Sequence, residues 1–512
     1  MNPVSNNRRI AKNAVMLYIR MFLTMIVGLY TSRVVLNVLG VEDYGIYGVV
    51  GGVVAMLGFL NASMSGATSR FLTFELGKGD KKRLADTFSS ALMVHIAIAL
   101  IVLIVAETVG LWFLNNKLVI PAERMTAARW VYQMSIASAM LGITQVPYNA
   151  TILAHEKMDI YAYVEILHVT LKLLIVYLLT IGDFDKLILY AALILAVSVI
   201  IILIYRIYCI RHFQESHFRL VWDKTIFKPL LSFSWQTIIA HMSYSFRLQG
   251  TNFVLNMLFG VIVNAATGIA STVNGTISQF SYNVIAAFNP QIIKSYAQND
   301  HASSCRLITA AAKYSTLLIL LIIIPFEFEA PQILRLWLGQ LPDYAVNFNR
   351  IMMLSLLTCV TNPVYTGLMA TGFIKSYSLI QAALYLLCPF AIYFLCRHFR
   401  APELSYVMIL FVQFMASVLV VAFFKRHVKA FRVRNYLLTV LRSIVLPACI
   451  SVAVCYVMYI SMNQNALRLI LITVTNGIIM CVLTYVGLTS AERMKLKLLV
   501  REKLSSVRDA IR

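Results

Sequence analysis

The stretch Ser243–Gln291, SYSFRLQGTNFVLNMLFGVIVNAATGIASTVNGTISQFSYNVIAAFNPQ, is apolar enough to cross a membrane twice and yet contains many polar side chains. The hydrocarbon core of a bilayer holds no water for such groups, and an arginine near its centre costs about 2.5–3.5 kcal/mol on insertion scales. We therefore expect a pair of helices whose polar faces line a wet cavity or pack against protein. The candidate lining residues are Asn252, Asn256, Asn274, Gln279 and Asn283.

A similar pattern occurs about 220 residues earlier in the chain. The segment VLNVLGV (35–41) matches VLNMLFGV (254–261), which has one inserted residue. In each copy six residues follow and then a glycine, Gly48 in the first and Gly268 in the second. Each copy lies at the turn between two apolar segments. Such a repeat is typical of transporters built from two related helical bundles around a shared site, and chance similarity between apolar segments is the alternative.

The composition excludes a soluble globular protein. Hydrophobic residues make up 60% of the chain and charged residues 13%, whereas about a quarter of an average soluble domain is charged. The apolar runs are continuous rather than alternating, which excludes a transmembrane β-barrel. The first run has no small-residue cleavage site, so we expect it to be retained as a helix. The sequence thus predicts an all-α polytopic membrane protein.

The net charge of +22 does not indicate a nucleic-acid partner. Lys and Arg gather in alternate loops, as the positive-inside rule describes, and both termini are therefore predicted to be cytoplasmic. The eight cysteines form no CxxC pair and lie mostly in apolar segments, so neither a metal site nor a disulfide framework is expected. No cofactor is predicted.

Fourteen apolar segments are predicted to span the membrane, in a six plus six plus two arrangement. Their approximate ranges are 13–39, 44–68, 85–114, 126–153, 160–181, 187–210, 230–259, 261–289, 307–325, 348–371, 377–396, 404–424, 437–460 and 467–488. The prolines and glutamates between 325 and 331 indicate a break in the ninth helix.

These segments group into five predicted regions. They are an N-terminal lobe (1–210), a cytoplasmic linker (211–229), a C-terminal lobe (230–426), two further helices (427–488) and a basic amphipathic tail (489–512). We expect the tail to lie on the anionic inner leaflet.

No enzyme activity is predicted, because the chain contains no GxxxxGK[ST], HExxH or GxSxG motif. The main candidates for substrate contact are Arg20 and Arg247, one on the first helix of each half. A guanidinium matches phosphate with a fixed fork of donors and stays charged. The alternatives are that Arg20 snorkels to the cytoplasmic interface and that Arg247 makes a structural hydrogen bond.

A second set of ionisable residues lies on the fifth predicted helix. Glu165, His168 and Lys172 are spaced three and four residues apart and therefore share one face. This face is either a structural ion pair or a site that couples transport to substrate or protons.

Three segments resemble the polysaccharide flippases of the multidrug/oligosaccharidyl-lipid/polysaccharide (MOP) superfamily, above all the Wzx-type O-antigen or capsule repeat-unit flippases. They are SRVVLNVLGVEDYGIYGVV (32–50), VNAATGIA (263–270) and FNPQIIKSYA (288–297). The resemblance implies two pseudo-symmetric, MATE-like six-helix lobes around a cationic cavity. It further implies alternating access that moves an undecaprenyl-pyrophosphate-linked oligosaccharide to the periplasmic leaflet of the bacterial inner membrane. Polysaccharide polymerase machinery is a candidate partner.

Three alternatives stay open at this point. A lipid II flippase of the same superfamily is one of them, since nothing in the sequence excludes it. A multidrug exporter coupled to cations would be expected to carry an acidic residue within its first or seventh helix, and the predicted segments 13–39 and 230–259 contain none. A membrane polysaccharide polymerase or ligase would be expected to have a large outer loop, which is also missing.

Overall fold

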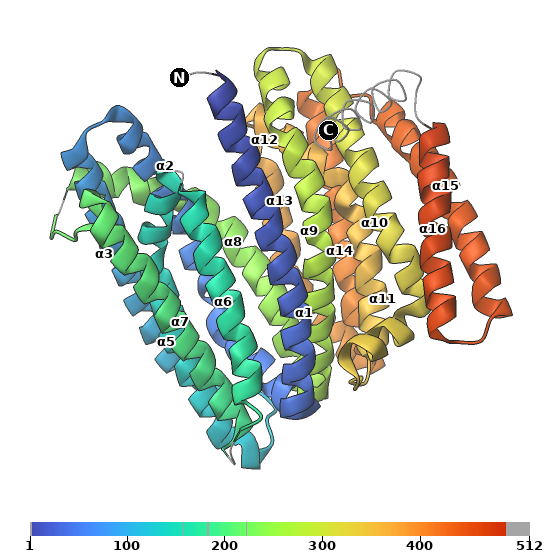
Figure 1. The fold of residues 1–512 in the computed structure, drawn as a ribbon, viewed down its shortest axis with the longest axis horizontal. Coiled ribbons are helices and arrows are strands. Elements are labelled where there is room, and N and C mark those ends of the chain that lie inside the picture. The colour runs from blue at the N-terminus through green and yellow to red at the C-terminus, as the bar shows by residue number, and fades with distance from the viewer. Residues whose placement is uncertain (1–2, 156, 182–183, 222, 488–512) are drawn as a thin grey trace, which may run out of the picture. The chain divides into compact units, whose positions relative to one another are not determined.

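The computed structural model describes residues 3–155, 157–181, 184–221 and 223–487, so the predicted tail 489–512 lies outside the described residues. Each of the fourteen predicted segments falls within helical structure, apart from a few residues at segment ends. Within the described residues, nine helical stretches are long and apolar enough to cross a membrane. The prediction of an all-α polytopic membrane protein is confirmed (Figure 1).

The α-helices are the following in chain order. They are α1 (Pro3–Met56), α2 (Gly58–Lys78), α3 (Lys81–Val105), α4 (Leu111–Asn116), α5 (Met125–Ala154), α6 (Met158–Leu178), α7 (Lys186–His212), α8 (Lys224–Phe259), α9 (Val261–Ala297), α10 (His301–Leu338), α11 (Ala345–Ser355), α12 (Asn362–Thr371), α13 (Lys375–Phe399), α14 (Leu404–His427), α15 (Val433–Ser461) and α16 (Ala466–Gly487). A π-helical turn, Ala106–Gly110, joins α3 to α4, and short 3-10 turns occupy Ala122–Arg124, Gln214–Ser216 and Leu356–Thr361.

Both copies of the sequence repeat turn at a glycine with the same unusual backbone. Gly40 interrupts α1 at φ 80° and ψ 170°, and Gly260 separates α8 from α9 at φ 81° and ψ −171°. This region of φ and ψ is essentially restricted to glycine. The repeat is therefore present in the structure as well as in the sequence.

The two copies also pack against each other immediately after these turns. A Cβ atom on Gly45 would lie 2.0 Å from the carbonyl oxygen of Val261 and 3.3 Å from the backbone nitrogen of Ala265. A Cβ atom on Gly268 would lie 3.3 Å from the ring of Tyr44. Glycine at these positions allows α1 and α9 to approach closely.

Two helix boundaries lie within predicted features of the chain. Helix α8 begins at Lys224, inside the predicted linker 211–229, where the carboxylate of Asp223 accepts a hydrogen bond from the backbone N–H of Thr225 at 2.7 Å. This N-cap starts the helix before its apolar segment begins. The break predicted in the ninth helix is confirmed as a kink at Glu329, beyond which α10 continues to Leu338.

The chain forms two compact units. Unit 1 contains Met1–Thr272, Arg335–Phe348 and Ser378–Val412, and unit 2 contains Val273–Leu334, Asn349–Tyr377 and Gln413–Arg512, with the described residues as given above. The division into lobes at 1–210 and 230–426 is a different one and stays a prediction.

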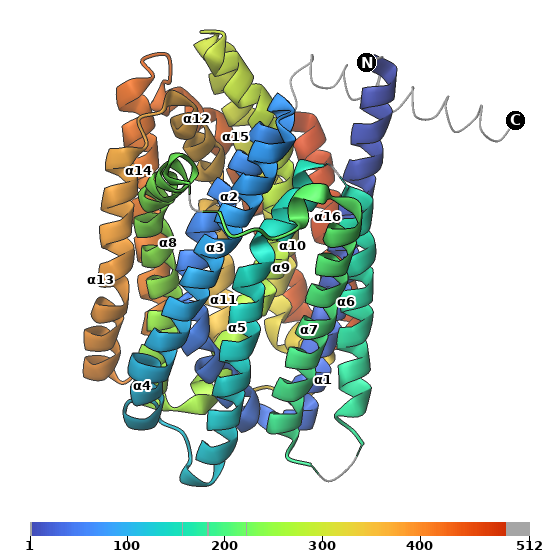
Figure 2. The same cartoon turned by 90° about the vertical axis from the view of Figure 1, so that its left-hand side faces the viewer.

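In unit 1, α5 packs along α7, and α2 packs against both α5 and α8. Helix α6 lies beside α7 and against α1 (Figures 1 and 2). The largest side chains in this interior, including Tyr132 and Phe88, are fully buried. Apolar burial of this kind fixes the helices that carry the candidate site.

Unit 2 has its own apolar core around α10, α12, α14, α15 and α16. It includes the fully buried residues Ile308, Leu368, Phe424 and Ile472. The final hairpin, α15 and α16, is part of this core because Cys455 and Ile472 belong to it.

An arginine clamp joins three segments at one end of unit 1. Arg124 donates from Nε and Nη2 to Asp43 at 2.8 and 2.6 Å, and from Nη1 to Asp185 at 2.6 Å. Asp185 also caps α7 by accepting from the backbone of Leu187 and Ile188. Burial acts to raise the pKa of Asp185, but the bonds from Arg124 and these N–H groups outweigh it and leave the pKa below its ordinary value.

Substitution of Arg124→Gln is expected to lower the free energy of unfolding by about 2 kcal/mol, because two carboxylates lose charged hydrogen bonds. The destabilisation should shrink as the pH falls through the folded pKa of Asp185, since a carboxylate with a depressed pKa stabilises the fold only while it is ionised. Thermal unfolding in detergent at several pH values measures this. Arg129→Gln, at an exposed position on α5, is the control. Equal melting temperatures for both variants would contradict the clamp.

Candidate substrate site

Arg247 is a buried cation in the middle of α8, with 7% of its surface exposed. Its guanidinium carbon lies 4.8 Å from the ring centre of Tyr385 on α13 and 5.4 Å from that of Tyr244. Among the described residues, no carboxylate forms an ion pair with Arg247. Its Nε has no hydrogen-bond partner in the part of the chain that the structure describes. The guanidinium thus retains unused donor capacity for an anion.

The close approach of α8 and α13 explains why Arg247 meets Tyr385. A Cβ atom on Gly250 would lie 2.9 Å from Cγ of Pro389. One turn earlier, the rings of Phe246 and Phe390 lie 5.8 Å apart. The missing side chain of Gly250 brings α13 near enough for its tyrosine to face the guanidinium.

Two different faces of α8 carry the predicted polar residues. Gln249, Asn252 and Asn256 are spaced three and four residues apart and share one face, whereas Arg247 is two residues, or about 200°, from Gln249. A Cβ atom on Gly52 of α1 would lie 2.7 Å from Oε1 of Gln249 and 3.5 Å from Nδ2 of Asn252. The amide face therefore meets α1, while Arg247 meets α13.

Asn256 is fully buried and belongs to a hydrogen-bond network. Its Nδ2 donates to Oδ1 of Asn264 at 2.8 Å and to the carbonyl of Val119 at 3.3 Å, and its Oδ1 accepts from the N–H of Val119 at 2.8 Å. Asn264 in turn donates to the backbone oxygen of Asn252 at 2.8 Å. Asn256 thus holds the segment after α4 against α8 rather than facing an open cavity.

Replacing Asn256 with alanine should lower the free energy of unfolding by about 1–3 kcal/mol, because the N–H and C=O groups of Val119 lose their buried partner. Asn116→Ala is the matched control, since this amide is exposed and bonds only within its own helix. Thermal melts of the purified variants compare the two. Similar melting temperatures would show that the network does not hold the segment in place.

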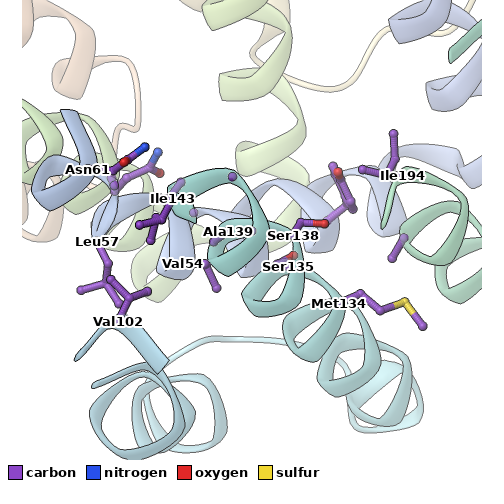
Figure 3. A pocket seen from close by; sticks show the side chains of 18 of the residues that line it. Val54, Leu57, Asn61, Val102, Met134, Ser135, Ser138, Ala139, Ile143 and Ile194 are labelled. Carbon is purple, nitrogen blue, oxygen red and sulfur yellow. The ribbon is translucent and has the colours of Figure 1, made fainter. Parts of the chain in front are cut away.

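Unit 1 contains a cavity of about 560 Å³ between α1, α2, α3, α5 and α7, with Gln249 of α8 at its edge. None of its lining residues is charged. Polar atoms come from Asn61, Ser135 and Ser138 together with Gln249 and Tyr47, and Figure 3 shows Asn61 and the two serines with apolar neighbours. Its volume is in the range of ordinary small-molecule sites, roughly 300–1,000 Å³.

The remaining predicted lining residues belong to unit 2. Asn274 donates to the carbonyl of Met352 and accepts from the hydroxyl of Ser278, both at 3.4 Å. Gln279 donates to Asn283 at 3.4 Å. These three amides thus lie in unit 2, while Asn252 and Asn256 lie in unit 1.

The three residues of α6 lie on one face as expected. Nδ1 of His168 lies 3.7 Å from Oε1 of Glu165, and both side chains are partly buried. Lys172 follows one turn later in α6 and is also partly buried. A role in coupling stays a prediction, as does the role of Arg20, which lies in α1 with a side chain outside the described part.

Sequence reasoning missed the cavity residues and a buried ion pair in unit 2. Ser135 and Ser138 gave no sequence signal, although the glycine-rich run GVVGG at 48–52 could have indicated space beside α1. In unit 2, Glu329 and Arg468 form an ion pair with Oε1 and Nε 2.6 Å apart and exposures of 0% and 7%. The only local signal was the kink predicted around Glu329.

Comparison with known proteins identifies a matching family. The model of a family described as polysaccharide biosynthesis protein matches residues 10–288, more than half of the chain. No curated protein matches the sequence significantly.

Several solved structures share the fold. A lipid II flippase, MurJ, in an inward closed conformation is 13% identical with a TM-score of 0.66, covering 92% of this chain and 98% of its own. An inward-facing multidrug resistance MATE family transporter of the MOP superfamily is 16% identical with a TM-score of 0.60, covering 82% and 98%. A MOP superfamily transporter from Pyrococcus furiosus is 16% identical with a TM-score of 0.57, covering 82% and 96%.

Proposed function

Because the chain belongs to the polysaccharide biosynthesis protein family, we propose that it is a flippase for a lipid-linked glycan. The substrate is an oligosaccharide repeat unit on undecaprenyl pyrophosphate, destined for O-antigen, capsule or exopolysaccharide. The protein moves it by alternating access from the cytoplasmic to the periplasmic leaflet of the bacterial inner membrane. Both termini of the chain are cytoplasmic.

The observation that carries this proposal is the buried guanidinium of Arg247, which forms no ion pair with a carboxylate of the described residues. A cation at 7% exposure without such a partner is costly unless an anion binds to it. A pyrophosphate supplies that anion and accepts the paired donors of a guanidinium. The rings of Tyr244 and Tyr385 hold the guanidinium in place when no substrate is bound. In this proposal Arg20 is the second contact for the pyrophosphate.

The uncharged cavity of unit 1 is suited to the sugar part of the same substrate. Its serine hydroxyls and amides offer both donors and acceptors to a hydroxyl-rich ring. The lipid chain stays in the bilayer, where its burial requires no protein site.

A cationic substrate fits this site less well. α8 carries no acidic residue, and Asp43 of α1 is already bonded to Arg124. A buried cation such as Arg247 repels a second one, so a multidrug exporter that binds cations is disfavoured.

Deletion of the gene in its host tests the proposal. We expect the complete undecaprenyl-linked unit to accumulate on the cytoplasmic face while surface polysaccharide is lost, and expression of the wild-type chain to reverse both changes. Accumulation on the periplasmic face would indicate a polymerase or ligase instead. Accumulation of lipid II would indicate a lipid II flippase. Unchanged glycans with greater sensitivity to cationic drugs would indicate an exporter.

A further inference from the structure

The cavity of unit 1 owes much of its open space to glycines. Gly48 and Gly51 on α1 and Gly142 on α5 are lining residues, and a Cβ atom built on any of them meets no atom of the described residues within 4 Å. Side chains at these positions would therefore project into empty space. Gly52 differs, because its Cβ would collide with Gln249.

The glycines are unfavourable for the helices that contain them. Glycine inside a helix costs about 1 kcal/mol relative to alanine, and none of these three positions has a positive φ that would require it. At Gly48, Gly51 and Gly142 there is also no neighbouring atom that excludes a methyl group. Neither backbone geometry nor packing explains them, so the space itself is the remaining explanation.

The polar atoms around this space indicate what it holds. Asn61 lines the cavity, and its buried Oδ1 has no hydrogen-bond partner among the described residues. A buried acceptor left unsatisfied costs about 1–3 kcal/mol, which a ligand donor would recover. Since no lining residue is charged, the matching ligand is neutral and rich in hydroxyl or amide groups. Figure 3 shows Asn61 at one side of the cavity and Ser135 and Ser138 at the other.

We infer that Gly48, Gly51 and Gly142 determine which sugars the protein accepts, by keeping open a site for roughly one or two uncharged sugar rings. This inference rests on the proposed flippase function. The glycines supply width, while Asn61 and the serines supply hydrogen bonds to the ring. Sugars with carboxylate groups are excluded, because no cation in the lining would compensate their buried charge.

The test introduces leucine at Gly51 and, separately, at Gly142, in the full-length chain expressed in the deletion host. Each variant should lower surface polysaccharide at least about tenfold, with the lipid-linked unit retained on the cytoplasmic face. Gly51→Ala, which adds only a methyl group, should give an intermediate loss. Gly28→Leu is the matched control, because this glycine also lies in α1 with nothing within 4 Å of its Cβ but is exposed and outside the cavity.

Two further measurements make the outcomes distinct. Thermal unfolding of the purified variants should give melting temperatures equal to or above that of the wild type, since leucine favours a helix more than glycine does. Binding of sugar-free undecaprenyl pyrophosphate, followed by native mass spectrometry, should be unchanged by Gly51→Leu. If the wild-type chain transports the glycan and both leucine variants transport it equally well, the inference is overturned. Failure of the wild-type chain itself to restore the glycan would overturn the flippase proposal.

The charge preference is tested in hosts whose repeat units differ. The wild-type chain should restore surface glycan where the unit contains only neutral sugars, and should fail where uronic acids replace them. Equal restoration of both units would contradict an uncharged sugar site.

Discussion

Arg247→Ala is expected to lower transport of the lipid-linked glycan by at least about tenfold, because a charged hydrogen bond contributes about 1.5–3 kcal/mol and 1.4 kcal/mol corresponds to a factor of ten. Arg247→Lys should keep part of the activity, since lysine retains the charge but not the planar fork. Surface polysaccharide and the lipid-linked unit in the complemented deletion strain measure both effects.

Arg397→Ala is the control for this substitution. Arg397 also contacts a tyrosine, donating to the hydroxyl of Tyr393 at 2.7 Å, but it is exposed near the end of α13. Its removal should leave transport unchanged. Near-normal transport by Arg247→Ala, at wild-type protein levels, would mean that the buried guanidinium is structural and that the anion binds elsewhere.

Glu329→Ala should have the largest effect on stability. It leaves Arg468 buried without its carboxylate, and breaking a buried pair in this way costs about 3–5 kcal/mol. Arg468 also donates to the carbonyls of Tyr459 and Met462 at 3.2 and 2.9 Å, which ties the end of α15 to the start of α16. We therefore expect a lower melting temperature, with the α15 and α16 hairpin more sensitive to proteolysis.

The double variant Glu329→Leu with Arg468→Met separates the ion pair from the packing. Replacing both charges by apolar side chains removes the uncompensated cation, so most of the lost stability should return. Arg83→Ala provides a surface comparison. The side chain of Arg83, which contacts Glu75, is half exposed, so this ion pair should contribute less than about 1 kcal/mol to the free energy of unfolding. Equal melting temperatures for Glu329→Ala and for the double variant would contradict this account.

The sequence predicted the helices well because a bilayer requires long apolar segments, whatever their tertiary contacts. It placed both turns only approximately, within the repeated segment, and the structure locates them at Gly40 in one copy and Gly260 in the other. Helix ends were less predictable, because the N-cap at Asp223 lies outside the apolar segment of α8.

The candidate site was only partly predictable, because side-chain direction depends on neighbouring helices. Arg247 stood out as an ionisable residue in an apolar segment, but its contact with Tyr385 depends on the close approach of α13 at Gly250. The partners Glu329 and Arg468 are 139 residues apart, and no periodicity links them. The cavity arises from the absence of side chains, which composition alone does not reveal.

The contact between the two repeat copies places different steric demands on its two sides. With the glycine turns aligned, Gly45 corresponds to Ala265, and the two residues lie close together. The space beside Gly45 admits no Cβ, because one built there would lie 2.0 Å from the carbonyl oxygen of Val261. Its counterpart, Ala265, carries a methyl group at the same contact. Corresponding positions of the two copies are therefore not interchangeable, and an alanine at position 45 would force the backbones of α1 and α9 apart.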